Sequence, residues 1–173
     1  MARMRAVSFS LAVAGLACAI AAAAPAPDRV QFPNLNLIDA KGGVQPLKAT
    51  LGRATVLNFW ATWCGPCRIE LPELQELYNE LGGKGLVTLA INVDSPRPHV
   101  DPFLKRNNLS LPVFFLEPEA EATLGIRSLP TTVLLDAEGK VVNVWGGYSP
   151  ESMREIRAQA EGLVAQPRGR GGK

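Results

Sequence analysis

Residues 58–70 of this 173-residue chain read NFWATWCGPCRIE. The stretch contains two of the chain's three cysteines, Cys64 and Cys67, with Gly65 and Pro66 between them. A Cys-x-x-Cys pair is typical of a redox-active dithiol, of half a metal site or of a structural disulfide. The patterns on either side of the pair help to separate these possibilities.

The residues around the pair predict a strand, a helix and a second strand. Runs 55–60 and 86–92 are mostly apolar, as in strands that are buried on both faces. Between them, apolar residues recur at spacings of three and four, the period of an amphipathic helix; they are Leu71, Leu74, Leu77, Tyr78 and Leu81. We expect Pro72 to kink this helix and Gly82-Gly83 to end it. The three elements form a right-handed βαβ unit.

The flanking segments complete an α/β domain. Residues 33–47 alternate around a Lys-Gly-Gly turn and predict an N-terminal hairpin. Three further elements follow in the pattern: a loop and short helix over 95–108, a strand over 113–116 and a short helix over 117–125. This order predicts a mixed central sheet with helices on both faces.

The C-terminal third predicts a second hairpin and a last helix. Strands over 131–135 and 141–145 flank the turn 136–139. Ser149 is placed to cap a helix that has Pro150 at its first position. Its inner face is expected to consist of Met153, Ile156, Ala160 and Leu163.

The distribution of charge excludes a nucleic-acid-binding surface of the usual kind. The formal net charge is +2, but between Asp28 and Gln166 there are 13 Lys and Arg against 16 Asp and Glu, a net of −3. The excess of basic residues lies at the two ends of the chain. We therefore expect no nucleic-acid partner.

The N-terminus is typical of a segment that directs export. Arg3 and Arg5 precede an uncharged run, 6–24, that ends in four alanines, which favours a signal peptide. An uncleaved membrane anchor and lipidation at Cys18 are the alternatives, and all three place the domain in the periplasm or outside the cell. If Cys18 leaves with the signal, only one internal cysteine pair remains.

The remaining boundaries follow from composition. Residues 1–24 are predicted to be a signal peptide or anchor, and residues 25–30 a Pro-rich linker. Residues 31–165 form the domain. Residues 166–173, which are basic and rich in Gly, are expected to be disordered.

The position of the cysteine pair predicts its chemistry. Cys64 falls at the start of the predicted helix, where first-turn N–H groups and the helix dipole stabilise a thiolate. Pro66 suits the first turn, because its missing N–H would have had no partner there. An exposed Cys64 would attack a substrate disulfide, and a deeper Cys67 would resolve the mixed disulfide.

The pair and its surroundings resemble a known family. WCGPC is similar to the thioredoxin signature, and the string over 58–74, NFWATWCGPCRIELPEL, resembles the exported TlpA/ResA branch of that superfamily. GIRSLPTTVLLDAEGKVV, residues 125–142, resembles the family's later segment, in which a cis proline faces the dithiol; Pro130 has that position. The resemblance covers about 31–165 and implies a thioredoxin-like fold with an inserted segment around 93–124.

The resemblance also implies the site residues. Cytosolic thioredoxins have a buried Asp where this chain has Asn58, and the exported branch has an acid three residues after the second cysteine, where this chain has Glu70. Glu70 is expected to hold or relay the proton of Cys67; the alternative is an exposed first-turn acid. The implied catalytic residues are Cys64, Cys67 and Glu70. The implied substrate groove consists of Trp63, Gly65, Pro66, Leu129 and Pro130.

We expect an exported thiol:disulfide oxidoreductase that needs no cofactor or metal. Strong oxidants of the superfamily have a His between the cysteines, whereas Gly65-Pro66 is typical of reductants. The expected substrates are protein disulfides, such as those of apocytochrome c or of oxidase copper sites, with electrons supplied by a membrane thiol-reducing partner.

Two other functions are disfavoured by the residues present. A non-catalytic or copper-handling assembly factor is the alternative, but the only histidine, His99, is distant and residues 125–147 contain none. A peroxidase would need a Pro and a Thr before its reactive cysteine, and the Pro is absent.

Overall fold

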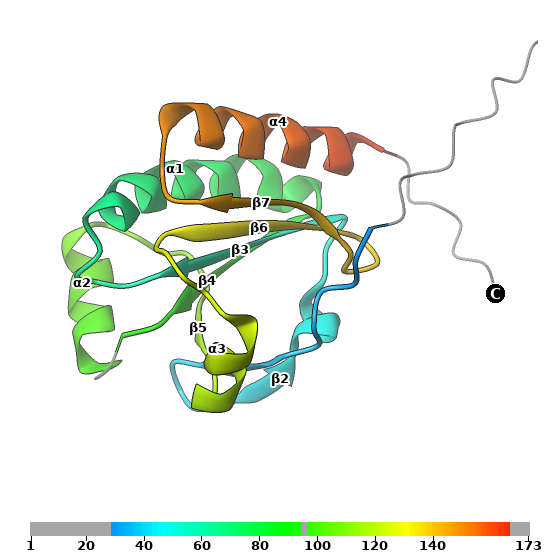
Figure 1. Ribbon diagram of the computed structural model, residues 1–173. Coiled ribbons are helices and arrows are strands. Elements are labelled where there is room, and N and C mark those ends of the chain that lie inside the picture. The colour runs from blue at the N-terminus through cyan, green and yellow to red at the C-terminus, as the bar shows by residue number, and fades with distance from the viewer. Residues whose placement is uncertain (1–28, 95–96, 167–173) are drawn as a thin grey trace, which may run out of the picture.

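The structure is a computed structural model that describes residues 29–94 and 97–166 (Figure 1). Its centre is a seven-stranded mixed sheet in the order β2-β1-β5-β4-β3-β6-β7. The strands are β1 (Asn36–Asp39), β2 (Val44–Pro46), β3 (Ala54–Trp60), β4 (Leu86–Asn92), β5 (Val113–Phe115), β6 (Thr131–Asp136) and β7 (Val141–Gly146). The helices are α1 (Gly65–Leu81), α2 (Val100–Arg106), α3 (Pro118–Leu124) and α4 (Pro150–Ala165).

The sheet is covered on both faces, as predicted. Helices α1 and α4 lie side by side on one face, and α3 lies on the other (Figure 1). Side chains of β3 alternate between two hydrophobic clusters: Val56 and Trp60 pack towards α1, whereas Leu57 and Phe59 pack towards the opposite face. Every residue of β3 is buried, which is why its sequence is mostly apolar.

The predicted βαβ unit is confirmed. Strand β3 pairs in parallel with β4 and antiparallel with β6. Helix α1 contains Pro72 and ends at Leu81, where the sequence places its end. The left-handed residue that closes this end is Gly85, with φ of 104°, after a short 3-10 turn at Gly82–Lys84. The Gly82-Gly83 pair itself is not left-handed.

The segment around 93–124 is integrated into the sheet. It contains α2, β5 and α3, and β5 pairs in parallel with β4 and antiparallel with β1. Strand β5 thereby joins the N-terminal hairpin to the rest of the sheet. Gly125 ends α3 with φ of 60°, which a glycine adopts without strain.

Helix α4 begins as predicted, at a capping box formed by Ser149 and Ser152. Met153, Ile156 and Ala160 are buried on its inner face. Leu163 also packs against this core, as predicted, but it is only partly buried, and the buried residue of the last turn is Val164. Val164 lies eleven residues after Met153, close to three turns of 3.6 residues.

The predicted export segment, 1–24, lies outside the described residues, as do Cys18 and nearly all of the basic tail. In the part of the chain that the structure describes, no helix combines the length and the hydropathy needed to cross a membrane.

Candidate active site

Cys64 and Cys67 form a disulfide at the N-terminus of α1, with an S–S distance of 2.04 Å. Cys64 is the N-cap residue, and its Sγ accepts a hydrogen bond from the backbone N–H of Cys67 at 3.2 Å. Cys67 is 0% exposed and Cys64 5%. Cys67 is therefore the deeper of the two, as expected. The expectation that Cys64 is exposed is wrong for this oxidised state, in which only 5% of the residue is accessible.

The loop that precedes Cys64 is held from two sides. The backbone N–H of Thr62 donates to Oδ1 of Asp94, at the end of β4, at 2.8 Å. Arg68, on α1, donates to the carbonyl oxygen of Thr62 from Nε and Nη2, at 3.0 and 2.8 Å. Trp63 projects from this loop and is 69% exposed. Sequence reasoning missed Asp94, although an acid directly after a buried parallel strand lies at the edge where such sites form.

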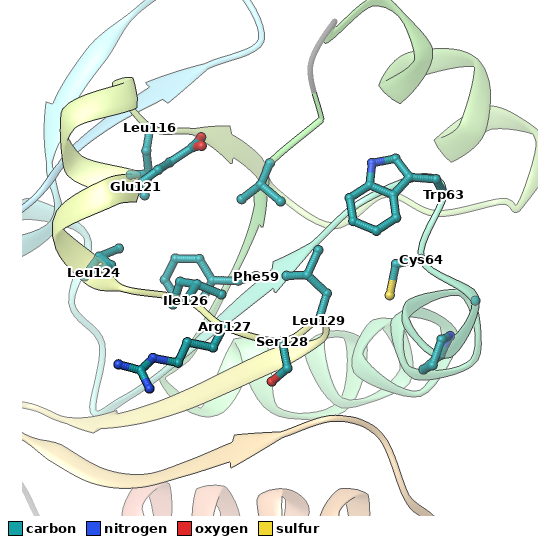
Figure 2. Close-up of a pocket in the computed structure, with 13 residues that line it drawn as sticks. Phe59, Trp63, Cys64, Leu116, Glu121, Leu124, Ile126, Arg127, Ser128 and Leu129 are labelled. Carbon is teal, nitrogen blue, oxygen red and sulfur yellow. The ribbon is translucent and has the colours of Figure 1, made fainter.

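A cavity of about 690 Å³ opens beside the disulfide. Four of the five predicted groove residues line it together with Cys64: Trp63, Gly65, Pro66 and Leu129. In Figure 2, Trp63 and Leu129 flank the Cys64 sulfur, and α3 forms the far wall. The cavity is thus continuous with the disulfide.

Sequence reasoning did not find the far wall of the cavity. That wall carries the opposite charges Glu121 and Arg127, and the apolar residues Leu124 and Ile126. Burial raises the pKa of Glu121, and the nearby charge of Arg97 lowers it. The segment after the Gly125 turn places Arg127 at the cavity, and no motif marks this position.

Pro130 is buried and is not among the residues that line the cavity, so its place in the substrate groove stays a prediction. The Leu129–Pro130 peptide bond is cis, as the resemblance implies. The Pro130 carbonyl oxygen accepts a hydrogen bond from the backbone N–H of Gly147 at 2.7 Å. The hydroxyl of Thr131 donates to the carbonyl oxygen of Ser128 at 2.7 Å. These bonds position Leu129 at the cavity.

Glu70 is buried beneath the disulfide and is 1% exposed, so the alternative of an exposed first-turn acid is wrong. Its Oε2 accepts from Nδ2 of Asn58 and its Oε1 accepts from the hydroxyl of Thr132, each at 2.8 Å. Burial raises the pKa of Glu70; the two hydrogen bonds oppose this and the charge of Glu73 adds to it. Three elements meet here, β3, α1 and β6, and Glu70 follows Cys67 by three residues, on the same face of α1.

The other residues singled out in the sequence, Trp60 and His99, do not line the cavity. Trp60 is 0% exposed and packs against Phe103 with ring centroids 5.3 Å apart, which confirms it as a core residue. His99 is exposed. Within residues 29–94 and 97–166, no three side chains of His, Cys, Asp or Glu gather closely enough to bind one metal ion.

The assembled site has the parts of a two-step thiol exchange. A sulfur at a helix N-terminus borders an open cavity, a second sulfur lies one turn deeper, and a buried carboxylate with a raised pKa follows on the same helix face.

Comparisons with known proteins agree with this arrangement. The family model described as AhpC/TSA family matches residues 29–160. A protein named thiol-disulfide oxidoreductase ResA from Halalkalibacterium halodurans is 36% identical over 126 residues, 72% of each chain. The ResA protein of Bacillus subtilis is 35% identical over 122 residues, which is 70% of this chain and 68% of that one.

Solved structures show the same fold. A putative thiol:disulfide interchange protein DsbE from Chlorobium tepidum superposes with a TM-score of 0.71 at 28% identity, covering 79% of this chain and 96% of that one. StoA from Bacillus subtilis, at 23% identity, superposes with a TM-score of 0.59 over 73% of this chain and 95% of that one.

Proposed function

The chain belongs to the AhpC/TSA family of thioredoxin-like proteins and is a thiol:disulfide oxidoreductase, and from this premise we propose that it is an exported reductant of specific protein disulfides. The observation that carries the proposal is the Cys64–Cys67 disulfide bordering a cavity between Trp63 and Leu129. A polypeptide bound in that cavity presents its own disulfide to Cys64.

In the first step the thiolate of Cys64 attacks one sulfur of the substrate disulfide. A bond forms between Cys64 and that sulfur, the substrate's S–S bond breaks, and the second substrate sulfur leaves as a thiolate. The position of Cys64 as N-cap of α1 supports this role, since first-turn N–H groups stabilise a negative sulfur.

In the second step Cys67 resolves the mixed disulfide. Its thiol gives a proton to the Glu70 carboxylate, and the resulting thiolate attacks Cys64. The Cys64–Cys67 bond forms and the substrate leaves with both of its sulfurs reduced. Two electrons have passed from the dithiol to the substrate. Burial supports Glu70 as the proton acceptor, because it raises the pKa of the carboxyl towards the range in which a carboxylate is an effective base.

The direction of electron flow is proposed from the residues between the cysteines. Gly65 and Pro66 carry no charge that would stabilise the reduced form, so the dithiol is a better electron donor than one that encloses a histidine. A donor in an oxidising compartment must be reduced again after each cycle, and we assign that step to a membrane thiol-reducing partner.

Export and substrate are proposed from the sequence. Residues 1–24 act as a signal peptide or as a membrane anchor, and they place residues 31–165 in the periplasm or outside the cell. The substrates are the paired cysteines of apocytochrome c or of oxidase copper sites, whose thiols must be reduced before haem or copper is attached.

The test is a trap for the mixed disulfide. In Cys67→Ser the first step proceeds and the second cannot, so the chain should accumulate disulfide-linked adducts through Cys64 when it is exported in a bacterium. Cys64→Ser is the matched control and should form none. Adducts with apocytochrome c or an oxidase subunit support the proposal; equal adducts in both variants overturn it.

The reduction potential tests the direction. Equilibrating the full chain with glutathione should give a reduction potential well below that of the strong periplasmic oxidants. Their reduction potential is about −120 mV. A potential at or above that value overturns the assignment as a reductant.

A further inference from the structure

Asn58, Glu70 and Thr132 form a closed triangle of hydrogen bonds beneath the disulfide. Nδ2 of Asn58 donates to Oε2 of Glu70 and to Oγ1 of Thr132, and the Thr132 hydroxyl donates to Oε1 of Glu70, all at 2.8 Å. All three side chains are buried, at 0, 1 and 1% exposed. Asn58 and Thr132 are direct partners in the β3–β6 register, so the sheet positions both.

The triangle matches the ionised form of Glu70. Its three sides use three hydrogens, two on the Asn58 nitrogen and one on the Thr132 hydroxyl, and three acceptor oxygens, two of which belong to Glu70. A proton added to Glu70 removes the negative charge that strengthens two of the three hydrogen bonds.

We propose that Thr132 is a positioning residue that holds Glu70 in its ionised form by donating its hydroxyl hydrogen to Oε1. Thr132 in turn accepts from Nδ2 of Asn58, so the amide orients the hydroxyl towards the carboxylate.

This inference rests on the proposed role of Glu70 in the second step. When Cys67 gives its proton to Glu70, one S–H bond breaks and one O–H bond forms, and no charge leaves the buried site. The proton then passes to solvent, and Glu70 returns to the carboxylate that the Thr132 hydroxyl stabilises.

Other titratable groups act on the same carboxyl. Cys67 and Glu73 lie on α1 beside Glu70, and Tyr148, whose hydroxyl donates to Glu73 at 2.5 Å, faces the pair from the end of β7. In the oxidised protein Cys67 does not titrate, because it is in the disulfide. The oxidised chain therefore separates the titration of Glu70 from that of Cys67.

The experiment is a carbon-13 NMR titration of the Glu70 carboxyl in the oxidised full chain. Thr132→Val keeps the shape of the side chain but removes its donor to the carboxylate. The midpoint should rise by about one pH unit, since a hydrogen bond to an ionised group favours that form. Thr132→Ser, which restores the hydroxyl, should return the midpoint to the wild-type value, and Glu73→Gln should move it down. An unchanged midpoint in folded Thr132→Val overturns the positioning role.

A second measurement needs no variant. The side-chain amide resonances of Asn58 in the wild-type chain should shift with pH at the Glu70 midpoint, because Nδ2 donates to the carboxylate that is protonated there. Asn58 resonances that do not change across that midpoint overturn the triangle. This readout decides the question even if Thr132→Val does not fold.

Failure of this inference differs from failure of the proposed function. Both titrations use the oxidised chain without substrate, so they give the same answer whichever way electrons flow. If Glu70 and Asn58 titrate together but Glu70→Gln resolves mixed disulfides at the wild-type rate at every pH, the triangle exists and the proton-accepting role of Glu70 is wrong.

Discussion

The carboxylate of Asp94 accepts a hydrogen bond from the backbone N–H of Thr62 at 2.8 Å, which ties the end of β4 to the loop before Cys64. Asp94 is 7% exposed, and its own N–H donates to Oδ1 of Asn92 at 2.9 Å. A second bond, from the N–H of Val93 to the carbonyl oxygen of Trp60 at 2.9 Å, joins the same two segments. The geometry of the active-site loop thus depends on its neighbour strand.

Asp94→Ala should lower the free energy of unfolding by about 1–3 kcal/mol, because the buried N–H of Thr62 loses its acceptor. Asp94→Asn keeps an oxygen acceptor, so its free energy of unfolding should fall by less than that of Asp94→Ala. The measurement is urea unfolding of the oxidised chain. Asp101→Asn, at an exposed carboxyl on α2, is the control, and an equal loss in this variant would contradict the prediction.

Glu70→Gln should change how stability depends on pH. Burial holds the folded pKa of Glu70 above its ordinary value of 4.5, so between the two values the folded chain binds more protons than the unfolded chain. The free energy of unfolding of the wild type therefore falls as pH rises through that window, by about 1.4 kcal/mol for each unit of pKa difference.

Glu70→Gln lacks this titration, so its stability relative to the wild type should increase as pH rises from about 4 to about 8. Urea unfolding of both oxidised proteins over that range measures the difference. Glu76→Gln, at an exposed carboxyl on α1, is the control, and its stability should depend on pH in the same way as that of the wild type. Parallel curves for Glu70→Gln would mean that the folded pKa is not raised.

The two tryptophans that flank the loop should respond differently to substitution. Trp60 is fully buried against Phe103, so Trp60→Ala should cost about 3–5 kcal/mol of stability. Trp63 is 69% exposed at the cavity, so Trp63→Ala should change stability by less than about 0.5 kcal/mol. It should instead raise KM for reduction of a protein disulfide. An unchanged KM would exclude Trp63 from the groove.

Ser149→Ala should destabilise the C-terminal helix. The Ser149 hydroxyl accepts from the N–H of Ser152 at 3.0 Å, and the N–H of Ser149 donates to the Ser152 hydroxyl at 2.9 Å. Loss of the cap should lower the free energy of unfolding by about 0.5–2 kcal/mol in urea, and Ser149→Thr should recover most of it. Glu161→Ala, on the exposed face of α4, is the control. If its free energy of unfolding falls as much as that of Ser149→Ala, loss of the helix cap does not explain the destabilisation.

Much of the fold could be predicted because its signals are local. Strands β3 and β4, helix α1 and the β6–β7 hairpin all follow from apolar periodicity and turn residues within short windows. At the far end of α4 both Leu163 and Val164 pack against the core, but the sequence pattern did not show that Val164 is the more deeply buried.

The site was less predictable because most of its contacts are distant in sequence. Glu70 was expected beside Cys67, but its partner Thr132 is 62 residues away and depends on the register of β6 against β3. Asp94 reaches Thr62 across 32 residues. Glu121 and Arg127 reach the cavity only because α3 packs across the sheet from α1.

The sequence alone determined the order of the elements and the Cys-Gly-Pro-Cys pair at a helix N-terminus, because periodicity, caps and the two-residue spacing are properties of neighbouring residues. Only the tertiary structure decided that Glu70 is buried in a triangle with Asn58 and Thr132, that Pro130 is buried, and that Cys64 is almost fully covered when oxidised. Burial and hydrogen-bond partners depend on strand register and on helix packing across the sheet, and these arise only when distant segments meet.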